Sequence, residues 1–346
     1  MQFGKSIKEK RKNTMNVKKL LSMVTAGMLA VTALAGCAGK TATDGTASKT
    51  DSDKTYKIGL IQLVQHEALD AATEGFKEAL TEKLGDKVEF DYQNASGDST
   101  TCATIAGQFV SSKVDLIFAN ATPALQAAYA ATPDIPIVGT SITDYATALE
   151  IDDWTGKTGY NVTGSSDLAP LAEQAEMFKE LLPDAKKIGL LYCSAEANSK
   201  YQVDIVAKEL EKLGYETKTY SFADSNDVSA VTTAACGEVD ALYIPTDNTA
   251  ASNTEIIDSV ASSKKIPIIA GESGICEGCG IATLSISYTE IGRIAGEMAY
   301  DILVNGKNPG DMDIKFATAP TKMYVADRCK ALGIEVPDTY EALEAE

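Results

Sequence analysis

Short apolar runs alternate with amphipathic segments from about residue 55 onward. The run Lys57 to Leu63 (KIGLIQL) is bounded by polar residues, which predicts a buried strand. From Ala68 to Leu84 the apolar residues recur at helical spacing, and Gly85 follows as a stop signal. Strands that alternate with helices in this way predict a parallel sheet with right-handed crossovers. Further strands are expected at Val88 to Tyr92, Leu116 to Ala119 and Ile135 to Val138, with helices at Thr100 to Ser112 and from Pro123.

The pattern restarts near residue 170 and predicts a second α/β unit of similar size. Lys187 to Tyr192 (KIGLLY) repeats the KIGLIQ of the first strand. Other strands are expected at Thr217 to Phe222, Ala241 to Pro245, Pro267 to Ala270 and Ala282 to Ile286. Helices are expected at Pro170 to Leu182, Ser199 to Leu213, Val228 to Ala235 and Glu255 to Ser263. The helix Ile291 to Val304 is expected to return to the first unit, and the helix Val325 to Leu332 to close on the second.

The two units predict an α/β fold in which two parallel-sheet lobes are joined by a hinge. The N-terminal lobe would comprise residues 55–160 plus 288–319, and the C-terminal lobe residues 161–287 plus 320–346. The chain would cross between them near Tyr145–Tyr160 and near Ser287–Glu290. Ligands in open α/β sheets bind at the carboxyl ends of the strands, so the cleft between the lobes is the expected binding site. Lobes joined in this way close around a ligand by hinge motion.

The N-terminal segment has the pattern of an export signal. Seven Lys and Arg residues precede or flank an apolar run from Leu20 to about Ala33, which is too short to span a bilayer as a permanent helix. Leu34-Ala35-Gly36-Cys37 then gives the lipobox order of a lipoprotein signal, so residues 1–36 are expected to be removed and Cys37 lipidated. A stray thiol in a secretory signal is the alternative for Cys37. Residues 37–54 are predicted to be a polar tether that holds the protein on the outer face of the bacterial membrane, and translation starts at either Met1 or Met15.

The charge of the chain limits its partners. The formal net charge is −18, and the signal carries seven basic residues and one acid, so its loss leaves −24. Such an acidic chain is unsuited to binding nucleic acid or anionic lipid surfaces.

Nothing in the sequence indicates an enzyme, a metal site or a cofactor. The chain has no G-x-G-x-x-G after the first strand, no Walker loop and no G-x-S-x-G elbow, and His66 is its single histidine. Cys276 and Cys279 have CxxC spacing, but a structural zinc site needs four ligands and no second pair exists. The neighbouring glycines predict a loop there, with incidental thiols or a local disulfide.

Polar residues follow the predicted strands. Ser, Thr, Asn and Asp at such positions are ordinary helix caps. Together, however, hydroxyls and helix-start amides can hold a carboxylate, and acids can accept an ammonium group, so a small zwitterion would find both. Asp247 is predicted to be the ammonium partner, with a capping role as its alternative. The other candidate acids are Asp144, Glu196 and Glu272, and Tyr160, Tyr192 and Tyr288 are candidates either for an apolar wall or for core packing.

Seven segments resemble one family in the same order along the chain, between about Lys57 and Pro337. They are KIGLIQLVQHEALDAATEGFKEAL, YQNASGD, ANATP, NVTGSSD, LLPDAKKIGLLYCSAEANS, YIPTDN and YTEIGRIAGEMAYDILVNGKNP. This sequence is similar to the solute-binding lipoproteins of ABC transporters, in the subgroup for tryptophan/tyrosine-type uptake. The resemblance implies a type I periplasmic-binding-protein fold, an aromatic amino acid in the interlobe cleft, and an ABC permease with its ATPase as partners. It also implies ligand contacts at Gln62, His66, Thr122, Ser141, Asp144, Ser165, Glu196, Asn198, Asp247 and Asn248.

Two features depart from the pattern of this family. Tyr145 stands where the family usually has proline, and the Cys276–Cys279 segment is usually simpler. A lipid-anchored sensor that passes a ligand-dependent shape to a membrane receptor would use the same fold, and it is the alternative function.

Overall fold

A computed structural model describes residues 54–343 of the chain. The predicted signal, Cys37 and all but the last residue of the predicted tether lie outside these residues. Among the described helices, none combines the length and the apolar character needed to cross a bilayer.

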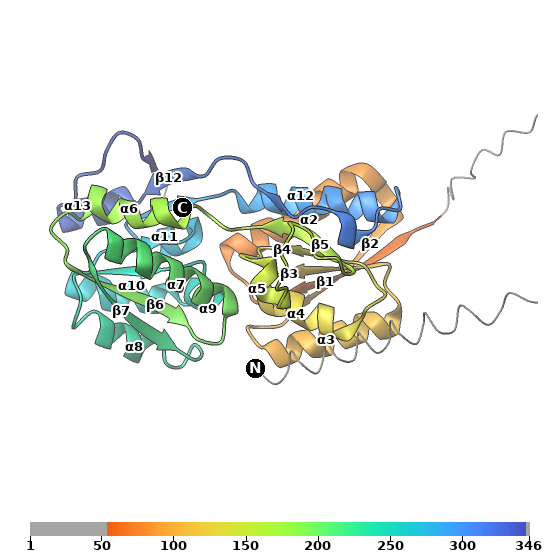
Figure 1. Ribbon diagram of the computed structural model, residues 1–346, viewed down its shortest axis with the longest axis horizontal. Coiled ribbons are helices and arrows are strands. Elements are labelled where there is room, and N and C mark those ends of the chain that lie inside the picture. The colour runs from red at the N-terminus through yellow and green to blue at the C-terminus, as the bar shows by residue number, and fades with distance from the viewer. Residues whose placement is uncertain (1–53, 344–346) are drawn as a thin grey trace, which may run out of the picture. The chain divides into compact units, whose positions relative to one another are not determined.

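The first sheet is parallel and has the strand order β11-β5-β4-β3-β1-β2 (Figure 1). Its strands are β1 Tyr56–Gln62, β2 Val88–Asn94, β3 Leu116–Asn120, β4 Ile137–Thr140, β5 Val162–Ser166 and β11 Lys315–Phe316. The helices that accompany it are α2 Glu67–Leu84, α3 Ser99–Ser112, α4 Thr122–Ala131, α5 Tyr145–Leu149 and α12 Tyr288–Leu303, with short 3-10 turns at Gly85–Lys87 and Pro309–Asp311.

The second sheet has the order β13-β12-β10-β9-β8-β6-β7 and is parallel except where β12 pairs with β10. Its strands are β6 Lys187–Cys193, β7 Glu216–Phe222, β8 Ala241–Ile244, β9 Ile268–Ala270, β10 Ala282–Ser285, β12 Thr321–Tyr324 and β13 Glu341–Ala342. Its helices are α6 Leu171–Leu181, α7 Ala197–Lys212, α8 Val228–Ala235, α9 Asn248–Ala251, α10 Thr254–Lys264, α11 Ser273–Cys279 and α13 Ala326–Leu332.

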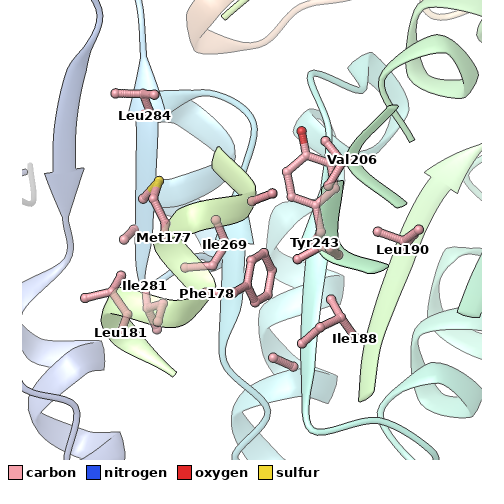
Figure 2. Packing of buried hydrophobic residues seen from close by; sticks show 14 of the residues in the cluster. Met177, Phe178, Leu181, Ile188, Leu190, Val206, Tyr243, Ile269, Ile281 and Leu284 are labelled. Carbon is pink, nitrogen blue, oxygen red and sulfur yellow. The ribbon is translucent and has the colours of Figure 1, made fainter. Parts of the chain in front are cut away.

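Each sheet has its own hydrophobic core, as the apolar runs predicted. In the first sheet, Phe76 of α2 stacks on Phe118 of β3 with ring centroids 3.9 Å apart. In the second, Phe178 and its apolar neighbours on α6 face the buried side chains of β8, β9 and β10 (Figure 2). The prediction of two α/β units with parallel sheets is therefore confirmed.

Helix α12 returns to the first sheet, also as predicted, and packs side by side with α2 (Figure 1). Glycines make this approach possible. A Cβ atom at Gly292 would lie 2.1 Å from the Ala72 carbonyl oxygen, and one at Gly75 would lie 2.3 Å from that of Thr289. The backbones of the two helices therefore touch directly, which fixes the helix that begins at Tyr288.

The first crossing between the sheets differs from the prediction. Strand β5 pairs with β4 and β11, so the chain leaves the first sheet after Ser166 and not near Tyr145–Tyr160. The segment VTGSS lacks a run of apolar residues, so its sequence predicts a hinge and not a strand. It is a buried strand because its hydroxyls are paired: Ser165 donates to the Ile291 carbonyl and Ser166 to that of Thr143.

The CxxC segment also differs, because it is the helix α11 and not a loop. Cys276 and Cys279 are both buried and neither is in a disulfide. The Arg328 guanidinium closes the end of this helix by donating to the carbonyls of Cys276, Glu277, Gly278 and Gly280. Burial raises the pKa of both thiols, so the thiolate needed for redox chemistry is disfavoured.

Candidate functional site

A small cavity lies among the loops at the carboxyl ends of both sheets. It receives residues from α2 and its cap, from the loops after β4, β5, β8 and β9, and from α7, α9 and α12. The lining residues are His66, Leu69, Ser141, Asp167, Asn198, Thr246, Asp247, Asn248, Ala251, Glu272 and Tyr288. Six of the eleven predicted site residues are among them: His66, Ser141, Asn198, Asp247, Asn248 and Glu272.

Two contacts join the loops of one sheet to those of the other beside this cavity. The His66 Nε2 atom lies 3.3 Å from Asn248 Oδ1, and Gln202 Nε2 donates to Thr143 Oγ1 at 3.3 Å. Burial lowers the pKa of His66, so its imidazole is neutral at pH 7, and the tautomer protonated at Nε2 donates to Asn248 Oδ1.

Five predicted residues do not line the cavity. Gln62 is buried beneath α2, where its amide bonds to Asp70 and accepts from Thr73. Asp144 caps α5 by accepting from the Thr147 N–H at 2.7 Å. Ser165 is tied to Thr140 and Ile291. Glu196 and Thr122 are the remaining two.

Glu196 does not line the cavity, but it holds a helix that does. Its carboxylate accepts from the backbone N–H groups of Asn248 and Thr249, at 3.1 and 2.9 Å, and from both of their side chains. These four bonds hold the first turn of α9, which carries Asn248 into the cavity. Its part in the site is therefore indirect.

Asp247 and Glu272 line the cavity, but their oxygens are used by the backbone. Asp247 accepts from the Ala250 N–H at 2.8 Å and from the Cys193 N–H at 2.6 Å. Glu272 accepts from the N–H groups of Gly274 and Ile275, at 2.7 and 2.5 Å, and so caps α11. The capping role, given as the alternative for Asp247, is what this geometry displays. Burial raises the pKa of Glu272 to about 7, and burial with the nearby Glu196 carboxylate raises that of Asp247.

Asp167 is a site residue that the sequence did not single out. It follows β5 directly and is 6% exposed. The Tyr288 hydroxyl donates to its Oδ2 at 3.2 Å, whereas its Oδ1 accepts no hydrogen bond from residues 54–343. Burial raises the pKa of Asp167 to about 6, and the hydroxyls of Thr143 and Tyr288 partly offset the rise. The feature of the sequence that could have identified Asp167 is its position at the end of NVTGSSD, a segment that is predicted to be a hinge.

Three buried polar atoms of residues that line the cavity are unpaired within the described part of the chain. They are Ser141 Oγ, Asp167 Oδ1 and Asn198 Oδ1. A buried polar group without a partner costs about 1–3 kcal/mol, so such atoms gathered around one cavity indicate places for the polar groups of a ligand. Ser141 Oγ is a hydroxyl that can donate, and the other two atoms are acceptors.

The charges around the cavity are all acidic. Asp167, Asp247 and Glu272 line it, and no lysine or arginine of the described residues does. An ammonium group is therefore the charged group that this site favours. Within the described residues, no three His, Cys, Asp or Glu side chains are arranged to hold a metal ion.

Comparison with known proteins agrees with this geometry. Residues 57–345 match the family of ABC transporter substrate-binding proteins. The chain is 40% identical over 323 residues to a tyrosine-binding protein of Clostridioides difficile, covering 92% of this chain and 93% of that one. These matches confirm the resemblance seen in the sequence, and they give no support to the sensor alternative.

Two solved structures share the fold. One is the domain of an ABC protein from Streptococcus pneumoniae in complex with L-Trp, with a TM-score of 0.79, 34% identity, and coverage of 83% of this chain and 97% of that one. The other is the ligand-free, open structure of a Clostridium difficile substrate-binding protein with adhesive properties, with a TM-score of 0.64, 38% identity, and coverage of 84% and 100%. The fold is that of type I periplasmic binding proteins, and the chain belongs to the family of ABC transporter substrate-binding proteins.

Proposed function

We propose that this protein binds an aromatic amino acid in the cavity between its two sheets and delivers it to an ABC permease. The observation that carries the proposal is a cavity whose charges are all acidic and whose lining residues include one unpaired hydroxyl and two unpaired acceptors. The hydroxyl, from Ser141, is suited to a carboxylate, and the acids are suited to an ammonium group. Leu69, Ala251 and the ring of Tyr288 offer apolar surface for a side chain.

The relatives support the same proposal. This chain has the higher TM-score with the relative solved with L-Trp, although its sequence is closer to the relative solved open and without ligand. The higher TM-score with the ligand-bound relative agrees with two contacts in this protein, His66–Asn248 and Gln202–Thr143. Each joins a residue beside the first sheet to a residue beside the second.

An aromatic amino acid should stabilise the protein by mass action. At a hundredfold excess over its dissociation constant the gain is about 2.7 kcal/mol. We expect L-tyrosine or L-tryptophan to raise the melting temperature of the mature protein, and isothermal titration calorimetry to give one site per chain. Glucose and divalent zinc serve as control ligands. If they raise the melting temperature while tyrosine, tryptophan and phenylalanine do not, the proposed ligand class is wrong.

The membrane anchor is part of this proposal, since Leu34-Ala35-Gly36-Cys37 has the lipobox order. Acyl chains on Cys37 would hold the exported protein at the membrane beside its permease. The variant Cys37→Ser should appear in the medium or accumulate unprocessed, whereas Ala38→Ser, which keeps the cysteine, should stay in the membrane fraction. Fractionation followed by mass spectrometry of the N-terminal peptide measures both. A processed, membrane-bound Cys37→Ser protein would contradict the lipid anchor.

A further inference from the structure

The geometry points to Asp167 as the residue that accepts the ammonium group of the ligand, with Tyr288 as the residue that positions it. This inference rests on the proposed function, since it assumes a ligand with an amino group. It replaces Asp247, which the sequence favoured for this role.

The oxygens of the other acids near the cavity already accept hydrogen bonds from the protein, so an ammonium group would have to share them. Both oxygens of Asp247 and both of Glu272 accept backbone N–H groups at 2.5–2.8 Å. Glu196 uses its two oxygens on Asn248 and Thr249 and does not line the cavity. An ammonium group at any of these three carboxylates would compete with an existing helix cap.

Asp167 has the opposite pattern. Its Oδ2 is held by the Tyr288 hydroxyl, and its Oδ1 is buried in the cavity wall without a hydrogen-bond donor from residues 54–343. A buried carboxylate oxygen that lacks a donor is a costly arrangement, which a ligand N–H would relieve. Because burial raises the pKa of Asp167 to about 6, the group is still largely ionised at pH 7, as an ammonium partner must be.

The position of Asp167 links this contact to both connections between the sheets. Asp167 follows β5, the last strand before the chain passes to α6, and Tyr288 is the first residue of α12, where the chain returns from β10. The preceding residue is fixed as well, because the Ser166 hydroxyl donates to the Thr143 carbonyl and accepts from the Leu168 N–H. An ammonium bound at Asp167 Oδ1 would contact the first connecting segment directly and the second through the bond between Asp167 Oδ2 and Tyr288.

The test compares two ligands on matched variants of the mature protein. L-Tyrosine carries the ammonium, and 3-(4-hydroxyphenyl)propionate is the same molecule without it. Asp167→Asn removes the charge and keeps the shape. Asp98→Asn is the control, because Asp98 is an exposed acid that follows a strand and caps α3 outside the cavity.

We expect Asp167→Asn to weaken L-tyrosine binding by about tenfold to a hundredfold, the usual loss for a charge-assisted hydrogen bond. Affinity for the analogue should change less than about threefold, and Asp98→Asn should bind both ligands like the wild type. Tyr288→Phe should weaken L-tyrosine more than the analogue, since the freed carboxylate loses its orientation. Calorimetry gives the affinities, and a thermal melt checks that each variant is folded.

Three outcomes would overturn the inference. Equal losses for both ligands would make Asp167 a purely structural residue, and an unchanged affinity for L-tyrosine would place the ammonium elsewhere. A wild type that binds only ligands without an amino group would overturn both this inference and the proposed function. If the wild type prefers a non-aromatic amino acid, only the aromatic assignment is overturned. The role of Asp167 is then decided by comparing that amino acid with its deaminated form on wild type and Asp167→Asn.

Discussion

Replacing Gly164 with alanine is expected to destabilise the protein by about 3 kcal/mol or more, because the residue has neither the conformation nor the space for a Cβ atom. Its φ is +152°, and a Cβ there would lie 2.0 Å from the Gly139 carbonyl oxygen and 2.3 Å from the Tyr145 hydroxyl oxygen. The carbonyl belongs to the neighbouring strand β4, which is fully buried, so it cannot move without disturbing the sheet.

The damage should extend to the site. Gly164 lies in β5, three residues before Asp167, and the Tyr145 hydroxyl donates to the carbonyl of the next residue in the strand, Ser165, at 3.0 Å. Displacing Tyr145 would shift the strand that positions Asp167. We therefore expect Gly164→Ala to weaken amino-acid binding as well as stability.

Urea unfolding followed by circular dichroism measures the stability, and Gly107→Ala is the matched control. Gly107 is an exposed residue of α3, and a Cβ atom added there would have nothing within 4 Å, so alanine should raise the stability by up to about 1 kcal/mol. The same substitution thus has opposite signs at the two positions. A Gly164→Ala protein as stable as the wild type would refute the steric argument.

The alternation of apolar runs carried enough information for the fold, because both sheets are built from short runs such as KIGLIQL that are buried on both faces. The apolar pattern did not predict the strand β5, because VTGSS is polar. Its serine side chains bond to the backbone of Ile291 and Thr143, which are distant in sequence. The prediction of a loop at SGICEGC, based on its glycines, was also wrong, because this segment is the helix α11. That helix depends on the Glu272 cap and on Arg328, 49 residues beyond Cys279.

The site was predicted in part for a related reason. Polar residues at strand ends could be found from the sequence, and six of the eleven candidates line the cavity. The sequence could not tell which carboxylate oxygens lack a donor from the protein, because that depends on the backbone N–H groups that bond to Asp247, Glu272 and Glu196. Tyr145, where the family usually has proline, is accommodated by Gly139 and Gly164, a match between α5 and the strands β4 and β5 that no local pattern displays.

The second large effect is a pH dependence with opposite signs for stability and for binding. In the unliganded protein the pKa of Asp167 rises from 3.8 to about 6 on folding, so its ionised form costs on the order of 3 kcal/mol above pH 6. The cost fades as the pH falls toward 3.8, because the group then becomes neutral in both states. Asp167→Asn never has this cost. We therefore expect the unliganded variant to be more stable than the wild type by about 3 kcal/mol at pH 7.5, and this difference to shrink as the pH falls through 6.

Taking the difference between wild type and variant removes most of the contribution of the other titrating groups to the pH dependence of stability. Glu272, with a pKa raised to about 7, gives the same sign as Asp167, and Asp247 does too. His66 acts the other way, because its lowered pKa lets the unfolded chain take up a proton first as the pH falls below 6.5. The Tyr288 pKa lies well above this range. All four groups remain in both proteins, so chemical denaturation of each at several pH values measures the contribution of Asp167 together with its repulsion of Glu272.

Ligand binding should show the reverse trend in the wild type. An ammonium group requires the ionised carboxylate, so protons compete with L-tyrosine, and its affinity should fall as the pH falls through 6, approaching a tenfold loss per pH unit. Affinity for 3-(4-hydroxyphenyl)propionate should not fall, because that ligand brings no positive charge to Asp167. In Asp167→Asn the difference between the two pH profiles should largely disappear. An L-tyrosine affinity that rises on acidification of the wild type would mean that the carboxylate is protonated in the complex, and the ammonium would then have to be held elsewhere.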